Sequence, residues 1–183
     1  RDWAYDEGER GRYELALKDF DDALKLAPKR RGALFLRGNV KQLLEDPEGS
    51  FADKQALLEL NPKDPKGHLG LCSYYAERKE LRRAVGHCDK AADLDPRYGE
   101  VFRHRCLARM DMGNLGAALE DCDRAVRFSP GQDDAWVSRG WVRDRRKDHA
   151  GALADFERAV ALNPRKAGGL AEKMADLKSR RRP

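Results

Sequence analysis

Five prolines recur at a constant interval of 34 residues, and this period constrains the fold more than any other feature of the chain. They are Pro28, Pro62, Pro96, Pro130 and Pro164. A fixed period of this length predicts a stack of similar structural units rather than a single globular core. It also argues against most enzyme folds, which lack such a period.

Small residues keep the same register as the prolines. Five residues before each proline stand Ala23, Leu57, Ala91, Ala125 and Ala159. Twelve residues before each stand Ala16, Ser50, Ala84, Ala118 and Ala152, and eight before stand Phe20, Lys54, Cys88, Cys122 and Phe156. Small side chains at fixed positions allow helices to approach closely, so these columns predict tight helix–helix packing.

Each unit carries two amphipathic helical patterns. In the fifth unit, apolar residues recur at helical spacing over residues 136–142, and a second apolar stripe follows over residues 152–162. Pro164 cannot continue the second helix, because it lacks an N–H group and clashes with the preceding turn. Asp64 followed by Pro65 is typical of a helix start.

Units of 34 residues with two helices and small, bulky, small and proline columns resemble tetratricopeptide repeats. The stretches from Ala118 to Pro130 and from Ala152 to Pro164 match the second helix of that repeat closely. The resemblance implies an all-α, right-handed superhelical solenoid of paired antiparallel helices. It divides residues 1–164 into a truncated first repeat at 1–30 and full repeats at 31–64, 65–98, 99–132 and 133–166.

Two repeats depart from the pattern. Repeat two has Pro47 near the start of its second helix, Ser50 in place of alanine and Lys54 at the bulky position, which puts its packing in question. Repeat one lacks the beginning of its first helix. Because the chain has no initiating methionine either, we expect the numbering to begin inside a longer chain.

The resemblance further implies a protein-binding scaffold or adaptor, since the first helix of each repeat lines a concave groove in this family. The groove would hold a peptide or helix of a partner protein. Carried over position by position, the expected groove residues are Tyr5, Phe35, Leu36, Asn39, Leu69, Ser73, Arg103, His104, Leu107, Val137, Ser138, Trp141 and Arg145. For Trp141, packing against a helix at the C-terminal end is the alternative.

The clamp by which some members of this family hold a partner's C-terminal carboxylate is missing. Asn39 matches one of its positions, but Phe35, Gly70, Glu100 and His104 stand where the other ligands are expected. Without the cations that pair a carboxylate, recognition of a free C-terminus by this clamp is disfavoured.

All four cysteines fall in the expected core columns, where cysteine acts as a small apolar residue. The spacing fits neither a Cys-x-x-Cys metal site nor an extracellular disulfide pattern, so we expect reduced thiols and an intracellular, reducing, most simply cytoplasmic location. Cys88 and Cys106 lie in successive predicted helices, and a disulfide between them, or a zinc site with His87 or His104, is the alternative.

Residues 165–183 follow the last repeat and differ from it in charge. A helix over residues 170–178, with Leu170, Met174 and Leu177 on one face, is expected to cover the end of the stack. This segment holds seven Lys or Arg and two Asp or Glu, so its net charge equals the +5 of the whole chain. The arginines at 180–182 allow a second function, contact with nucleic acid, although basic residues also suit the end of a helix.

No catalytic, cofactor-binding or metal-binding constellation is present in the sequence. The phosphate-loop pattern is missing, and paired carboxylates such as Asp133 and Asp134 suit helix starts. No apolar run approaches the roughly 18 residues of a membrane span. A third possibility is a structural subunit or assembly factor that associates with other copies through the ends of the solenoid.

Overall fold

The structure, a computed structural model, describes residues 3–180 and the side chains from residue 8 onward. The described residues form an all-helical chain without β-strands. Its helices are α1 (Trp3–Leu26), α2 (Arg31–Leu43), α3 (Pro47–Leu60), α4 (Pro65–Glu77), α5 (Leu81–Leu94), α6 (Gly99–Asp111), α7 (Leu115–Phe128), α8 (Asp133–Arg145), α9 (His149–Leu162), the 3₁₀ turn η1 (Pro164–Lys166) and α10 (Ala167–Ser179).

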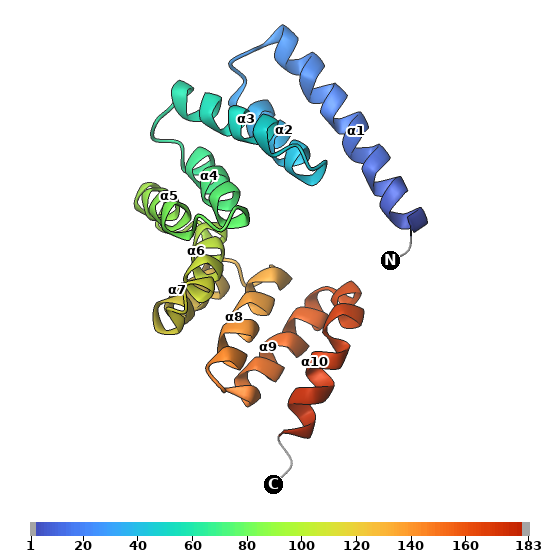
Figure 1. The fold of residues 1–183 in the computed structure, drawn as a ribbon, viewed down its shortest axis with the longest axis vertical. Helices are drawn as coiled ribbons and strands as arrows, with labels where there is room; N and C mark the ends of the chain where they lie inside the picture. The colour runs from blue at the N-terminus through green and yellow to red at the C-terminus, as the bar shows by residue number, and fades with distance from the viewer. Residues whose placement is uncertain (1–2, 181–183) are drawn as a thin grey trace.

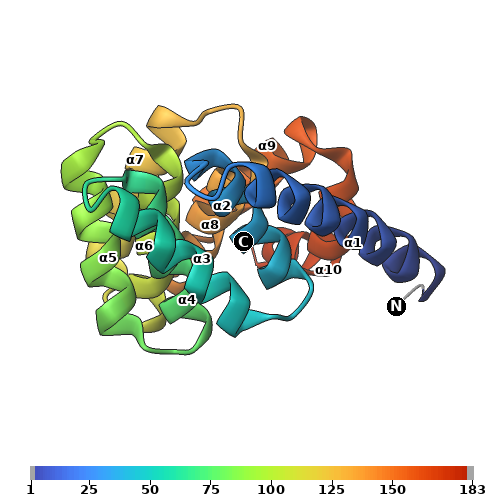
Figure 2. The same ribbon diagram turned by 90° about the horizontal axis from the view of Figure 1, so that it is seen from above.

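The helices form a curved stack of pairs, α2 with α3, α4 with α5, α6 with α7 and α8 with α9 (Figure 1). Figure 2, a view from above, shows the same pairs arranged along a superhelical path. The structure therefore has the helical repeat solenoid that the 34-residue period predicts.

The turn inside each pair is built from the same backbone conformation. The middle residue of its three has a positive φ of 60–81° in all four pairs, at Glu45, Lys79, Gly113 and Lys147. A left-handed residue just after a helix lets the chain reverse direction and satisfies the last carbonyl groups. These four residues are themselves 34 positions apart.

The small-residue columns lie at the centre of the packing. The alanines at 84, 91, 118, 125, 152 and 159 are completely buried. Their size allows the backbones of neighbouring helices to approach, and each repeat therefore shares its core with the repeats on either side.

The first helix differs from the expected helix pair. The chain from Trp3 to Leu26 is one continuous helix of 24 residues, with no turn near Gly11. Gly11 stands 34 positions before Glu45, where the other repeats reverse direction. Gly11 is compatible with helix as well as with a turn, and α2 is the one helix of the described residues that contacts α1.

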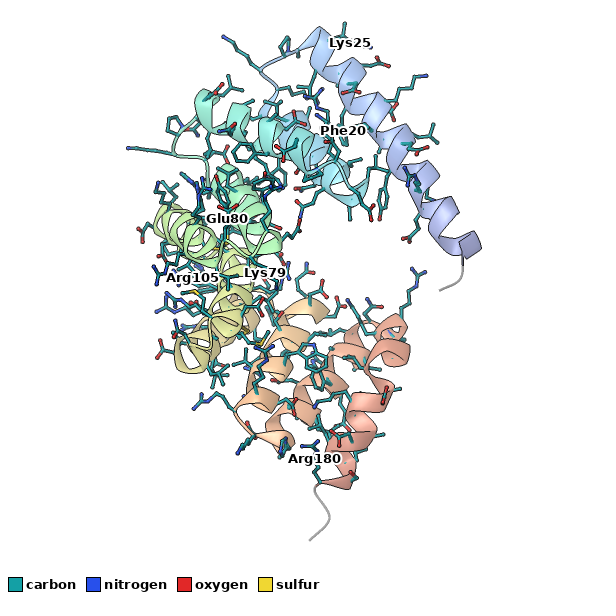
Figure 3. All side chains as sticks on the ribbon, viewed as in Figure 1. Phe20, Lys25, Lys79, Glu80, Arg105 and Arg180 are labelled. Atoms are coloured by element: carbon teal, nitrogen blue, oxygen red, sulfur yellow. A yellow bond between two sulfur atoms is a disulfide. The ribbon has the colours of Figure 1, made fainter. Side chains whose placement is uncertain are left out.

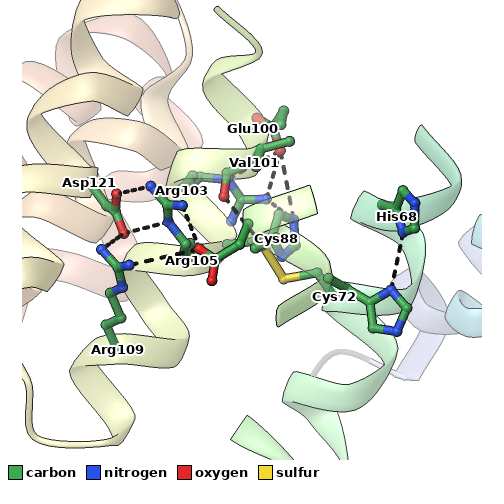
Figure 4. Close-up of a disulfide and its surroundings, with 12 residues drawn as sticks. His68, Cys72, Cys88, Glu100, Val101, Arg103, Arg105, Arg109 and Asp121 are labelled. Carbon is green, nitrogen blue, oxygen red and sulfur yellow. Dashed lines mark hydrogen bonds and ion pairs between the residues drawn. A yellow bond between two sulfur atoms is a disulfide. The ribbon is translucent and has the colours of Figure 1, made fainter. Parts of the chain in front are cut away.

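The expectation of reduced thiols is also wrong. Two disulfides join Cys72 to Cys88, as Figure 4 shows, and Cys106 to Cys122, and no free cysteine remains. Cys88 and Cys106 are not paired with each other. The physical reason is that the partners, 16 residues apart, face each other across the two helices of one repeat, where their Cα atoms are 5.4 Å apart.

The C-terminal helix α10 lies against α9 and buries Leu170 and Leu177. Met174 and the rings of Trp141 and Phe156 belong to the same apolar cluster. Together, these contacts cover the end of repeat five. No helix among the described residues is long and apolar enough to cross a membrane.

Candidate functional site: a pocket in the concave groove

A pocket of about 310 Å³ opens on the groove between α2, α4 and α6. Five of the predicted groove residues line it, namely Phe35, Asn39, Leu69, Ser73 and His104. The other lining residues are Gln42, Leu43, Gly70, Tyr98 and Glu100. The walls are therefore largely apolar and carry a few hydrogen-bonding groups, the composition that is typical of binding pockets.

The 34-residue period explains why these side chains converge. Phe35 and Leu69 occupy the same position in successive first helices, and Asn39 and Ser73 do so one turn later. Because the first helices of successive repeats lie side by side, equivalent positions form rows along the groove.

Several predicted groove residues contribute to packing instead. Trp141 packs edge-to-face on Phe156 with ring centroids 5.1 Å apart, and it contacts the cluster that α10 completes. Val137 belongs to the same cluster, and Leu107 packs beside the Cys106–Cys122 pair. The structure thus gives Trp141 the packing role that was its alternative.

The remaining predicted residues lie outside the pocket. Ser138 is buried and donates a hydrogen bond to the Asp134 carbonyl, while Arg145 donates to the Met110 carbonyl. Leu36 lines a different hollow, beside α1. Tyr5 lies in α1, and its side chain is outside the described part of the chain.

Lys54 forms part of the floor behind the pocket, which the sequence did not indicate. Its side chain is completely buried and runs between Gly38 and Gly70. A Cβ atom at Gly70 would lie only 2.9–3.1 Å from three carbons of the lysine. The two glycines therefore provide the space that lets a lysine replace the bulky residue of the repeat.

The Lys54 amine is linked to the pocket wall by a hydrogen bond to Gln42. It donates a 2.5 Å hydrogen bond to the Gln42 side-chain oxygen, and the Gln42 amide donates to Ser73 and to the Glu77 carboxylate. Burial lowers the pKa of Lys54 to about 8, although the charges of Glu77 and Asp53 oppose that change. The network fixes the orientation of Gln42 in the pocket wall.

His104 is held in one tautomer beside the pocket. Arg103 donates a hydrogen bond to its Nε2 atom and also pairs with Glu100 at 2.9 Å. Burial lowers the pKa of His104 to about 3, and the positive charge of Arg103 contributes. The ring is therefore neutral at physiological pH, with its proton on Nδ1.

The packing between the two helix layers contains a repeated ion cluster that the sequence reasoning did not identify. In repeat four, Arg105 pairs with buried Asp121 at 2.7 Å and with Asp89 of the preceding repeat, also at 2.7 Å, and Arg109 pairs with Asp121. Figure 3 marks the place of Arg105 in the molecule, and Figure 4 shows it beside Asp121 and Arg109. The 34-residue register is the signal that would have revealed it. The equivalent clusters are Arg37, Lys41, Asp53 and Asp21 in repeat two, and Arg139, Arg143, Asp155 and Asp123 in repeat five.

Repeat three replaces this ion cluster with rings. His68 and His87 approach with their Nδ1 atoms 3.2 Å apart, His87 stacks on Tyr75, and Arg83 lies over the Tyr75 ring. Burial lowers the pKa of both histidines, that of His87 to about 4. No group of three or more potential metal ligands is present among the described residues.

Comparison with known proteins gives a consistent result. The sequence profile of the tetratricopeptide repeat matches residues 1–40 and 106–167. No curated protein sequence matches the chain.

Several solved structures share the fold. TTC0263, a tetratricopeptide repeat protein of Thermus thermophilus, superposes with a TM-score of 0.81 at 21% identity, covering 91% of each chain. A tetratricopeptide repeat protein from Parabacteroides merdae gives 0.76 at 22% identity, covering 93% of this chain and 66% of the other. YrrB, described as having an unusual peptide-binding site, gives 0.61 at 20% identity, covering 91% and 86%.

Proposed function

Because this chain belongs to the tetratricopeptide repeat family, a family of protein-interaction scaffolds, we propose that its concave groove binds a peptide or helix of a partner protein. The observation that carries the proposal is the pocket between α2, α4 and α6, where side chains from the first helices of three repeats converge. The role we propose is binding and not catalysis.

The pocket suits an apolar side chain of the partner. Phe35, Leu43, Leu69 and Tyr98 supply apolar surface, and Leu43 is 58% exposed. Burying such a side chain against this surface supplies the affinity, on the order of 25 cal/mol per Å² of apolar area removed from water.

Polar groups in the pocket wall fix how the partner lies. Asn39 and Ser73 offer hydrogen bonds to a backbone or to an amide side chain, and Glu100 disfavours an acidic group at this point. An acidic partner segment would have to lie elsewhere along the groove. Because the stacked helices hold these groups in place before binding, little conformational entropy is lost.

The experiment begins with capture of partners by the tagged protein from a native lysate, with and without nuclease, and identification by mass spectrometry. A peptide from a captured partner is then titrated calorimetrically against the parent protein and its variants. We expect Phe35→Ala and Leu43→Glu to weaken binding at least about tenfold, as loss of a central anchor does. Leu26→Glu, at a residue that is 89% exposed and outside the pocket, is the control.

Equal affinity of all three variants and the parent protein would refute the pocket as the binding site. Loss of every partner after nuclease treatment would favour the second function, contact of the basic C-terminal segment with nucleic acid. That function rests on the sequence of residues 165–183, and Arg181 and Arg182 lie outside the described residues.

A further inference from the structure

The sequence of α1 contains the parts of a complete repeat, although the structure has a single helix there. Gly11 is in register with the turn residues Glu45, Lys79, Gly113 and Lys147. Ala4 stands 16 residues before Phe20, as Cys72 and Cys106 stand 16 residues before their disulfide partners. The segment before Gly11 therefore has the pattern of a first helix, and the segment after it that of a second.

The N-terminal half of α1 has no helix packed against it within the described chain. At 24 residues α1 is about 36 Å long, while α2, the helix it contacts, has 13 residues and is about 20 Å long. The contacts come from the C-terminal half, where Phe20 and Leu24 pack on Ala33 and Leu34. The other end of α1 extends beyond the stack (Figure 2).

A hollow marks the place where the missing first helix would lie. In repeat two, Lys54 lies between Gly38 of its own first helix and Gly70 of the next. Its counterpart in repeat one, Phe20, has Leu36 on one side and, among the described residues, no first helix on the other. The result is a hollow of about 310 Å³ that Phe20, Ala23, Ala33 and Leu36 help to line. Leu36 is 47% exposed there.

We propose that this hollow is a self-association site, filled by residues 3–10 of a second copy of the chain. A straight α1 carries its N-terminal half away from its own hollow, so the same segment of another copy is the occupant with the matching sequence. The exchange is reciprocal, because each copy offers both a free segment and a free hollow. The product is a two-fold dimer in which each copy completes the first repeat of the other.

The 34-residue register predicts which residues of the docked segment contact the hollow. In repeats three and four, the residues equivalent to Ala4 and Phe20 lie with Cα atoms 5.4 Å apart. In repeat five the equivalent pair is Gly140 and Phe156, which are also in contact. A docked segment therefore places Ala4 of one copy on Phe20 of the other, at a distance that a disulfide can span.

Cysteine crosslinking tests this arrangement directly. Ala4→Cys and Phe20→Cys are made on separate chains, mixed, and oxidised, and the products are separated without reductant. We expect a covalent dimer of about 42 kDa, twice the 20.8 kDa of one chain, containing one chain of each kind. The double variant Ala4→Cys/Phe20→Cys reports the alternative, because a segment folded back on its own chain gives a monomeric crosslink.

A second measurement does not depend on the cysteine variants folding correctly. Light scattering on a sizing column should give the dimer mass for the parent protein and for the control Leu26→Glu. Leu36→Glu, a charge placed in the hollow at an exposed position, should shift the mass to that of the monomer. A monomeric parent protein, a Leu36→Glu variant that remains dimeric, or a crosslink formed only within one chain would each overturn the proposal.

Discussion

At the scale of single residues, the repeats keep their helix spacing by changing two positions together. The positions 16 residues apart, one in each helix of a repeat, contain glycine with a long side chain or cysteine with cysteine. The pairs are Gly38 with Lys54, Cys72 with Cys88, Cys106 with Cys122 and Gly140 with Phe156. The volume between the helices is thereby filled in three different ways.

Replacement of one member of such a pair should destabilise the protein. In Gly140→Ala the new Cβ would lie 2.6–3.0 Å from three ring carbons of Phe156, which is buried and has little space to move. We expect a loss of about 1–3 kcal/mol in the free energy of unfolding, measured by denaturant titration.

Gly86→Ala is the matched control, since no atom lies within 4 Å of the new Cβ in the middle of α5. It should stabilise the protein by about 0.5–1 kcal/mol, because alanine favours a helix over glycine. If both substitutions stabilise the protein, Phe156 does not constrain position 140.

The sequence predicted the repeats because proline and small residues report on helix ends and close contacts, which are local. Five of the residues that it proposed for the groove, including Phe35 and His104, line one pocket, because equivalent positions form rows. It did not predict the role of Lys54, which depends on two glycines in different helices. The disulfides were not predicted. The pairing considered, Cys88 with Cys106, joins the second helix of one repeat to the first helix of the next, whereas the disulfides join the two helices of one repeat.

At the scale of elements, the two central helix pairs differ from the others in being covalently closed. Cys72–Cys88 joins α4 to α5, and Cys106–Cys122 joins α6 to α7, and all four residues are fully buried. These pairs also supply Leu69, Ser73 and His104 to the pocket. The disulfides therefore limit separation of the helices that support the proposed binding site.

Loss of one disulfide should lower stability without abolishing the fold. Closing a loop of about 15 residues contributes on the order of 3 kcal/mol by restricting the unfolded chain. We expect the double variant Cys106→Ala/Cys122→Ala to have a lower midpoint of thermal unfolding than the parent protein. Addition of a reductant should then lower the midpoint of the variant by less than that of the parent.

Mass spectrometry of the denatured parent protein after thiol alkylation provides the control. Four alkylated cysteines before reduction would contradict the disulfide pairing. Unmodified cysteines that react only after reduction would agree with it.

At the scale of the whole molecule, three histidines that are wholly or partly buried make stability depend on pH. Burial lowers the pKa of His68, of His87 to about 4 and of His104 to about 3, whereas the unfolded chain has a value near 6.5. The unfolded state therefore binds more protons below pH 6.5. The contribution of these histidines to the free energy of unfolding is fully present above that pH. It is lost as the pH falls towards their folded-state pKa values.

We expect the free energy of unfolding to fall by about 2 kcal/mol between pH 7 and pH 5, a sum over partly exposed rings. Denaturant titrations at several pH values measure this slope. His87→Gln should make the slope shallower, because the glutamine does not titrate. An unchanged slope in that variant would show that His87 does not contribute.

The ion cluster between neighbouring repeats determines which rearrangements of the array keep its contacts. The first arginine of each cluster pairs with one carboxylate from the repeat before it, as Arg139 pairs with Asp123. Excision of residues 99–132 would bring Asp89 into that place and preserve the pairing. Excision of residues 65–98 would instead bring Gln55 to Arg105 and leave the arginine one carboxylate short. Loss of the fourth repeat therefore preserves this ion pair, whereas loss of the third does not.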